Sequence, residues 1–303
     1  MSVQRSMNLD IESKISEFER LMKEFMARKA IYKIIFRGKG LEFDSYRYYA
    51  PDDDARDIDW KASNRANKLL VKQYIEERDL KIMFVVDVGE NMISGSAEKL
   101  KCEYVAEVCA TLAHLIIGYG DKIGFAFFNE RVFKMEFPKS GLKQFEIFAN
   151  ELSNPLLYGG VSDTGKALDF ILDYFDNSIA IIILVSDFIR TKKDIVKNIN
   201  FLSEKFETIA IMIRDPLDKT MPQINGEVAI EDSATGEQII VNPAVARKIY
   251  EKNAMEQEKM IKEIFMNAGV DFLELNTKED FPIPLADFLK ERVEKGKYIS
   301  SKV

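Results

Sequence analysis

Short apolar runs that recur between amphipathic segments constrain the fold of this chain more than any other feature of its sequence. Every residue of Ile82–Val86 is apolar, and apart from one glycine the same holds for Ile123–Phe128 and Ile179–Val185. A strand that is buried on both faces of a parallel sheet has this pattern, because neither face meets water. Further strands are predicted at Thr208–Ile213 and Asp271–Leu275, with an antiparallel edge strand at Val132–Phe137.

Helical patterns separate these strands. Apolar residues repeat at helical spacing near residues 98–117, 142–152, 167–175, 193–202, 242–269 and 284–294. Strands and helices that alternate at these lengths imply right-handed crossovers and a sheet sandwiched between helices. We therefore predict an α/β fold with a mostly parallel, Rossmann-like sheet over residues 81–303, carrying an inserted hairpin near residues 222–242.

Residues 1–80 are predicted to form an N-terminal helix and a small β-rich extension. An apolar stripe lies on one side of a predicted helix at Asp10–Met26, with Asp10 as a plausible N-cap. This helix could pack on the sheet or serve as an arm that binds a partner. A strand is predicted at Ile31–Phe36 and a turn at Gly38–Gly40, and residues 41–80 indicate short strands and loops.

Composition argues against several classes of protein. Hydrophobic residues make up 47% of the chain and charged residues 31%, an ordinary globular balance. No apolar stretch is long enough to span a bilayer, and the polar start of the chain does not resemble a secretory leader. We therefore expect a cytoplasmic protein. A net charge of -7 argues against a general nucleic-acid binder, which needs a basic surface.

Few residues are available for cofactor or nucleophile chemistry. The single histidine, His114, leaves no second one for a zinc site or a histidine-activated nucleophile, and no phosphate-binding P-loop is present. Cys102 and Cys109 are seven residues apart on a predicted helix, about 10 Å at 1.5 Å per residue, which is too far for a disulfide. Both are expected to be small buried residues.

Three polar clusters occupy positions where an open sheet would bind a ligand. They comprise residues 87–91 and 186–187, directly after predicted strands, and residues 159–164, before a helix. Ligands of such sheets bind at the carboxyl ends of the strands, where the strand order reverses. Carboxylate and hydroxyl oxygens there would suit Mg²⁺. The alternative is that Asp87 and Asp187 merely cap the turns that follow them.

These clusters resemble the metal-ion-dependent adhesion site of von Willebrand factor A domains. Asp87 matches the leading aspartate of that site, Ser162 or Thr164 its loop threonine, and Asp187 its last aspartate. Gly89 and Asn91 stand where two serines belong, so Gly89 offers no ligand and Asn91 a carbonyl oxygen at most. The resemblance implies a degenerate Mg²⁺ site, open to a carboxylate of a partner protein, formed by Asp87, Asn91, Ser162 and Asp187.

A longer match lies upstream. Residues 40–43 and 46–60, with Asn64-Arg65 and Val71-Lys72, resemble the signature of the domain-of-unknown-function 58 family, although Asp52 replaces a glycine and Asn64 an alanine. The likeness continues through residues 246–285. Members of this family carry a von Willebrand A-like domain and are commonly encoded beside ring-forming ATPases of the MoxR type. The resemblance implies a non-catalytic adaptor that couples such a motor to a client, in chaperone-like remodelling or maturation.

Two other functions stay open. One is a Mg²⁺-dependent phosphatase or hydrolase that uses Asp87 as nucleophile or ligand and Asp187 as second ligand. Such enzymes also need a second aspartate two residues on, where this chain has Gly89, together with a phosphate-binding hydroxyl and a positioned lysine. The other is a purely structural subunit.

The acidic tract from Asp52 to Trp60 has its own alternatives. Its five aspartates would repel one another unless Arg47, Arg56, Lys61 and Arg65 place positive charge among them, which favours an ion-paired, ordered loop packed by Trp60. A surface that docks a partner is the next interpretation, and a calcium site the last, because the EF-hand spacing is absent. The residues that would serve as the structural or partner-binding signature are Arg47, Asp53, Asp54, Arg56, Asp57, Asp59, Trp60 and Arg65.

Overall fold

A central sheet of six strands has the order β10-β7-β6-β3-β4-β5. In this computed structural model, residues 6–23, 25, 42–50, 58–75, 80–224, 226–231 and 238–300 are described. All neighbouring strands are parallel except β5, which runs antiparallel to β4 at one edge, as the sequence predicts. The strands are β3 (Lys81–Asp87), β4 (Lys122–Phe128), β5 (Val132–Lys139), β6 (Ile181–Ser186), β7 (Glu207–Arg214) and β10 (Asp271–Asn276).

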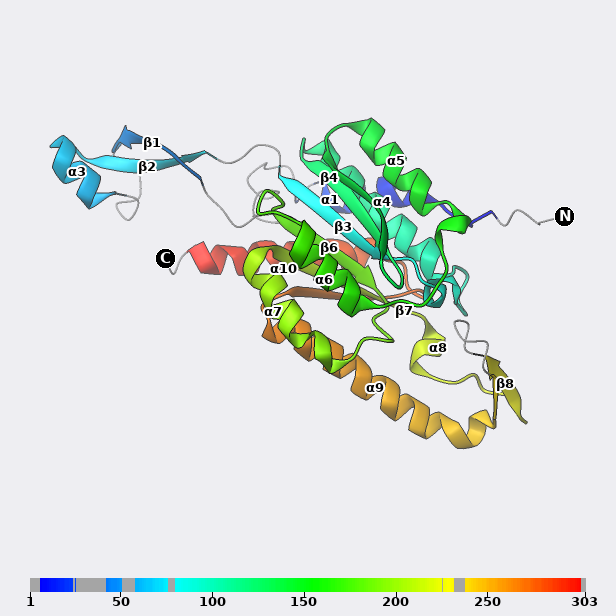
Figure 1. Ribbon diagram of the computed structural model, residues 1–303. Helices are drawn as coiled ribbons and strands as arrows, with labels where there is room; N and C mark the ends of the chain where they lie inside the picture. The colour runs from blue at the N-terminus through cyan, green and yellow to red at the C-terminus, as the bar shows by residue number, and fades with distance from the viewer. Residues whose placement is uncertain are drawn as a thin grey trace.

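Helices cover both faces of this sheet (Figure 1). Along β3, Phe84 and Val86 pack into one core while Met83 and Val85 pack into the other, which explains why the strand is apolar throughout. The predicted α/β architecture is therefore correct. One face is covered by α1 (Ile11–Met22), α4 (Lys101–Gly118), α5 (Leu142–Leu152) and α10 (Pro282–Ser300); the other by α6 (Thr164–Tyr174), α7 (Val196–Lys205) and α9 (Pro243–Asn267).

Helix α1 packs on the sheet body rather than standing apart as an arm. Its Phe18 and Met22 are buried against α4 and α10. Asp10 stands at the N-cap position, but its side chain makes no capping hydrogen bond; its backbone N–H donates to Glu107 instead. The helix ends at Met22, before the predicted Met26, which lies outside the described residues.

The β-rich extension contains a helix that the sequence analysis did not predict. Strands β1 (Glu42–Tyr48) and β2 (Leu70–Ile75) pair antiparallel, and α3 (Trp60–Ala66) lies between them in the chain. With seven residues, α3 is too short to show a helical period, so the expectation of strands and loops was wrong there. In Figure 1 this unit lies away from the central sheet. The predicted strand at 31–36 and turn at 38–40 lie outside the described residues.

A second extension follows β7. The predicted hairpin is formed by β8 (Val228–Glu231) and β9 (Gln238–Val241), while its predicted turn at 235–236 lies outside the described residues. Asn242 then caps α9 by accepting a hydrogen bond from the N–H of Ala244, as expected of an Asn-Pro pair. Shorter helical segments are η3 (Glu90–Ile93), η4 (Pro155–Leu157), η5 (Lys193–Ile195) and α8 (Pro216–Lys219).

Within the described parts of the chain, no helix is both long and apolar enough to cross a membrane.

Candidate functional site

The predicted site lies where the strand order reverses, at the carboxyl ends of β3 and β6. Asp87 is the last residue of β3, and Asp187 follows the last residue of β6. We call this edge of the sheet the crest and define it as residues 87–101, 158–164, 186–191 and 214–218. At the crest Asp87, Asn91 and Ser162 are joined by hydrogen bonds, and Asp187 is near enough for its charge to act on Asp87, so the predicted residues lie at the same edge of the sheet.

Asp87 is fully buried and accepts four hydrogen bonds. One oxygen accepts from the backbone N–H of Gly89 at 2.9 Å and from the hydroxyl of Ser162 at 2.5 Å. The other accepts from the hydroxyl of Ser186 at 2.7 Å and the side-chain amide of Asn91 at 3.2 Å. A carboxylate offers about four lone-pair sites. Asp87 therefore has no free acceptor position for another ligand.

The hydroxyl of Ser162 faces two acceptors. Its oxygen is 2.5 Å from Asp87 Oδ1 and 2.5 Å from Asn91 Oδ1, yet a hydroxyl carries one proton. The Asp87 carboxylate and the side-chain oxygen of Asn91 therefore compete for that proton. Burial, together with the charge of nearby Asp187, raises the pKa of Asp87 to about 6, against the hydrogen bonds from Ser162 and Ser186, which lower it.

Two glycines let the crest loops approach one another. A Cβ atom at Gly89 would lie 2.0 Å from Ser162 Oγ and 2.5 Å from Asn91 Oδ1, so these two side chains fill the space of the missing serine. Gly160 has a φ of 79°, a left-handed conformation that favours glycine. Backbone hydrogen bonds from Gly159 to Val88 and from Glu90 to Gly160 then join the loops.

Asp187 is paired with a buried lysine. Lys101 Nζ lies 2.7 Å from Asp187 Oδ2 and 3.3 and 3.2 Å from the two carboxylate oxygens of Asp218. Burial opposes the charge of Lys101, but these two carboxylates raise its pKa above the ordinary value, so it stays protonated. The other oxygen of Asp187 accepts the N–H of Ile189 at 3.0 Å. Asp187 therefore both caps the turn that follows it and forms an ion pair with Lys101.

Phe188, directly after Asp187, holds an unfavourable backbone conformation. Its φ of 52° is uncommon for a residue with a large side chain. The side chain is buried and lies 5.1 Å from the ring of Phe265 on α9, while its N–H donates to Ser186 Oγ. Packing from α9 therefore helps to hold the turn that carries Asp187.

A further aspartate at the crest was not predicted. Asp215 follows β7 and accepts hydrogen bonds from both the backbone and the hydroxyl of Ser96, from the N–H of Leu217 and from Thr277. Burial alone would raise its pKa, but these bonds hold the pKa of Asp215 below its ordinary value. Asp215 joins the loops after β3, β7 and β10.

One rule would have found Asp215, because a carboxylate directly after a buried strand is the signal that identified Asp87 and Asp187. Lys101 and Asp218 had no such signal. A lysine in the first turn of a helix ordinarily extends into solvent, and its partners lie 86 and 117 residues further along the chain.

The predicted magnesium ligands fit a divalent cation poorly. Gly89 supplies no ligand, the oxygens of Asp87 are already bound, and Asp187 is neutralised by Lys101. Across the described residues, no group of three or more His, Cys, Asp or Glu side chains is placed to hold a metal ion. Thr164, the alternative loop ligand, instead shares a hydrogen bond with Thr191. The side chains of the crest therefore do not fit a bound Mg²⁺.

The structure describes four of the eight signature residues, Arg47, Asp59, Trp60 and Arg65. Asp59 caps α3 by accepting the N–H groups of Lys61 and Ala62, and it also accepts the hydroxyl of Tyr46. Trp60 is 66% exposed, and the part of the acidic loop that it is predicted to pack, residues 52–57, lies outside the described residues. Arg47 lies on β1 and Arg65 on α3, whereas Asp53, Asp54, Arg56 and Asp57 lie outside the described residues.

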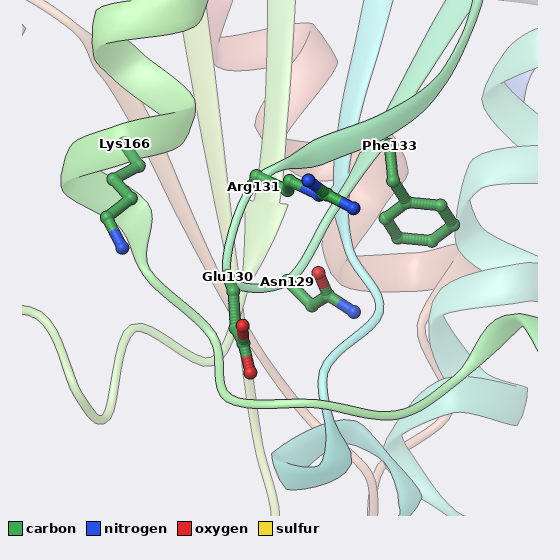
Figure 2. Close-up of a pocket in the computed structure, with 5 residues that line it drawn as sticks. All are labelled: Asn129, Glu130, Arg131, Phe133 and Lys166. Atoms are coloured by element: carbon green, nitrogen blue, oxygen red, sulfur yellow. The ribbon is translucent and has the colours of Figure 1, made fainter.

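A shallow hollow lies beside the crest, at the turn between β4 and β5 (Figure 2). Asn129 connects it to the crest, since its side-chain amide donates to the carbonyl of Gly159 at 2.7 Å. None of the residues predicted for the metal site lines it. Its lining residues are Asn129, Glu130, Arg131, Phe133 and Lys166.

Comparison with known proteins places the chain among uncharacterised relatives. The family described as "Protein of unknown function DUF58" matches residues 45–260. An uncharacterized protein of Mycobacterium tuberculosis is 24% identical over 259 residues, which is 84% of this chain and 80% of that protein. An uncharacterized protein of Mycobacterium bovis matches to the same extent.

Solved structures that match this chain share little sequence with it. The conserved hypothetical protein BatB from Bacteroides thetaiotaomicron is 13% identical, with a TM-score of 0.47, over 71% of this chain and 99% of that one. An aerotolerance-related membrane protein from Bacteroides fragilis gives the same values. The von Willebrand A domain of SpRpn10 is 12% identical, with a TM-score of 0.40, over 69% of this chain and 93% of that one.

Proposed function

This chain belongs to the family described as "Protein of unknown function DUF58", and from that premise we propose that it is a non-catalytic adaptor that binds a MoxR-type ring ATPase through its signature unit. We define the signature unit as the described residues of 42–75. The resemblance of residues 40–72 to the family signature supports the choice of partner. The structure of the described residues of this unit supports the choice of binding surface.

One observation carries the choice of surface. Trp60, the single tryptophan of the chain, is 66% exposed, and Tyr48 is 63% exposed on the same unit. Tryptophan and tyrosine are enriched among the residues that dominate binding energy at protein interfaces, because they bury a large area with few rotatable bonds. Among the described side chains of the unit, the buried ones are those of Ile58, Ser63 and Val71. Trp60 therefore stays available to a partner.

The local structure holds this surface in place. Asp59 caps α3 at the residue before Trp60, and the same carboxylate accepts the hydroxyl of Tyr46 on β1 at 3.0 Å. Lys68 lies 4.8 Å from the ring centre of Tyr48. These contacts hold the backbone at the start of α3 and the rings of Tyr46 and Tyr48 before binding, which lowers the entropy lost on association.

The crest supports a non-catalytic assignment. Asp87, which would serve as nucleophile in a hydrolase, is fully buried and accepts four hydrogen bonds. A nucleophile needs a free lone pair that faces the substrate. The arrangement instead ties together loops from several strands, which suits a rigid scaffold.

We would test the proposal by measuring the affinity of the purified chain for a purified MoxR-type ATPase of the same organism. Trp60→Ala is expected to weaken binding at least tenfold, which corresponds to about 1.4 kcal/mol. Tyr174→Ala is the matched control, because Tyr174 on α6 is also 66% exposed but lies outside the signature unit. Equal affinity of the wild type and Trp60→Ala would contradict the proposed surface, and no binding of the wild type would contradict the partner.

One observation favours the hydrolase alternative. Lys101 supplies the lysine that such enzymes need beside their aspartates. Hydrolysis of p-nitrophenyl phosphate by the wild type in the presence of Mg²⁺, abolished by Asp87→Asn, would establish that alternative and overturn the non-catalytic assignment.

A further inference from the structure

We infer that the ammonium group of Lys101 takes the place of the divalent cation at the crest, so that the site is neutralised and held together without a metal. This inference concerns the cation of the crest and does not depend on the partner proposed above. It rests on the position of Lys101, on the bonds already made by the aspartates, and on the space around Gly89.

Lys101 binds the two carboxylates that a metal would otherwise have to neutralise. Its Nζ lies 2.7 Å from Asp187 and within 3.3 Å of both oxygens of Asp218. The side chains of Lys101 and Asp187 are 1% and 2% exposed. An ammonium group has three donors, and these contacts use them on two carboxylates, one in the turn after β6 and one in α8. A second cation at Asp187 would therefore meet a fixed positive charge.

The placement of this lysine is unfavourable by itself. Lys101 is the first residue of α4, where the positive end of the helix dipole disfavours a cation, and burial removes its hydration. A lysine is tolerated in such a position only when close anionic partners compensate it. Asp187 and Asp218 are those partners, which indicates that the three side chains form one unit.

The second half of the site is closed as well. All four acceptor positions of Asp87 are used by Gly89, Asn91, Ser162 and Ser186. The volume next to Gly89, where a hydroxyl ligand would stand, is filled by Ser162 and Asn91. Asp87 is therefore satisfied by neutral donors, while Asp187 is satisfied by Lys101.

Lys101 also performs the mechanical task of a bound metal, which is to join loops. It connects the first turn of α4, reached from β3, with the turn after β6 and with α8, which follows β7. These three segments follow adjacent strands of the sheet. Their relative positions are thus set by the chain itself and do not vary with metal concentration.

The test is metal titration of the intact chain, by calorimetry and by thermal unfolding. For the wild type we expect no binding heat with Mg²⁺ or Mn²⁺ alone at millimolar concentrations, and the same Tm with either ion or with EDTA. Lys101→Met is expected to lower the Tm, and its Tm is expected to rise when Mn²⁺ or Mg²⁺ is added, because the carboxylates of Asp187 and Asp218 then lack the cation that neutralises them. Lys166→Met, an exposed lysine on α6, is the control and should show neither change.

Two results would overturn the inference. The first is metal binding by the wild type that is lost in Asp187→Asn. The second is a folded Lys101→Met variant whose Tm does not respond to either ion. If Lys101→Met does not fold, the triple variant Lys101→Met, Asp187→Asn, Asp218→Asn removes all three charges; it should recover folding and stay insensitive to metal. Failure of the adaptor proposal would leave all of these results unchanged.

Discussion

Cys102 and Cys109 are buried thiols on helix α4, as the sequence analysis expects. Burial, with a smaller effect of the Glu103 charge, raises the pKa of Cys102 to about 12, and burial raises that of Cys109 well above its ordinary value. The thiolate is the reactive form, and a free cysteine has a pKa of about 8.5. Both thiols therefore stay protonated at pH values where exposed cysteines ionise.

We predict that neither cysteine of the native chain reacts with Ellman's reagent at pH 8, and that both react after denaturation. The raised pKa also fixes the sign of the pH dependence. The two buried thiols contribute fully to the free energy of unfolding below the pKa that a cysteine has in the unfolded chain, about 8.5. This contribution is lost as the pH rises toward the higher pKa of the folded state. Alkaline conditions should thus lower the free energy of unfolding. Rapid labelling of either thiol without denaturant would contradict the burial of α4.

The positions of Asp87 and Asp187 were predictable, because a residue directly after a strand in a parallel sheet must lie at its carboxyl edge. The partners of these residues were not. The pairing of Lys101 with Asp187 depends on tertiary packing, and the sequence around Lys101 is that of an ordinary helix start. The exposure of Trp60 was not predictable either, because Trp60 belongs to α3, a helix too short to show a period in the sequence.

At the scale of elements, the loop before α6 depends on the backbone of Gly160. Its φ of 79° is unfavourable for any residue with a side chain. An added Cβ atom would also lie only 2.9 Å from Asn129 Nδ2. We predict that Gly160→Ala lowers the free energy of unfolding by about 1–3 kcal/mol, measured by urea denaturation. Because this loop carries Ser162, the variant should also disturb the hydrogen bonds of Asp87.

Gly118→Ala is the matched control for this change. Gly118 is the last residue of α4, has no positive φ, and an added Cβ would meet no atom within 4 Å. The variant should be unchanged or more stable by up to about 1 kcal/mol, since alanine loses less backbone entropy. Equal destabilisation by both variants would show that the loop conformation at Gly160 is not required.

Long elements with a clear period were predictable, and short ones were not. The apolar runs identified β3 and β6, and the Asn242-Pro243 pair identified the start of α9. Helix α3 has only seven residues, so its sequence shows no helical period. It is held instead by the capping hydrogen bonds of Asp59 and by the pairing of β1 with β2. Tertiary context decides such segments.

At the scale of the whole molecule, sequence position does not decide which segments share the main core. Helix α1 lies near the start of the chain, yet Phe18 and Met22 belong to the core of one face of the sheet. The signature unit follows α1 in the chain, and its residues are absent from both cores as far as the structure describes them. The main body is thus built from α1 and from residues 80 onward.

This division predicts that truncation of a buried aromatic residue of the main body destabilises the protein far more than truncation of the exposed tryptophan. Phe18 is 1% exposed, so Phe18→Ala should lower the free energy of unfolding by about 3–5 kcal/mol, since it removes a ring and leaves a cavity between α1, α4 and α10. Trp60→Ala removes a larger ring but an exposed one, and should change that free energy by no more than about 0.5 kcal/mol. Urea denaturation followed by circular dichroism measures both free energies of unfolding.

If Phe18→Ala destabilised the protein as little as Trp60→Ala, α1 would be a helix docked on a body that is stable without it. If Trp60→Ala were as costly as Phe18→Ala, the tryptophan would be part of a core, and the surface proposed for the partner would have to be sought elsewhere.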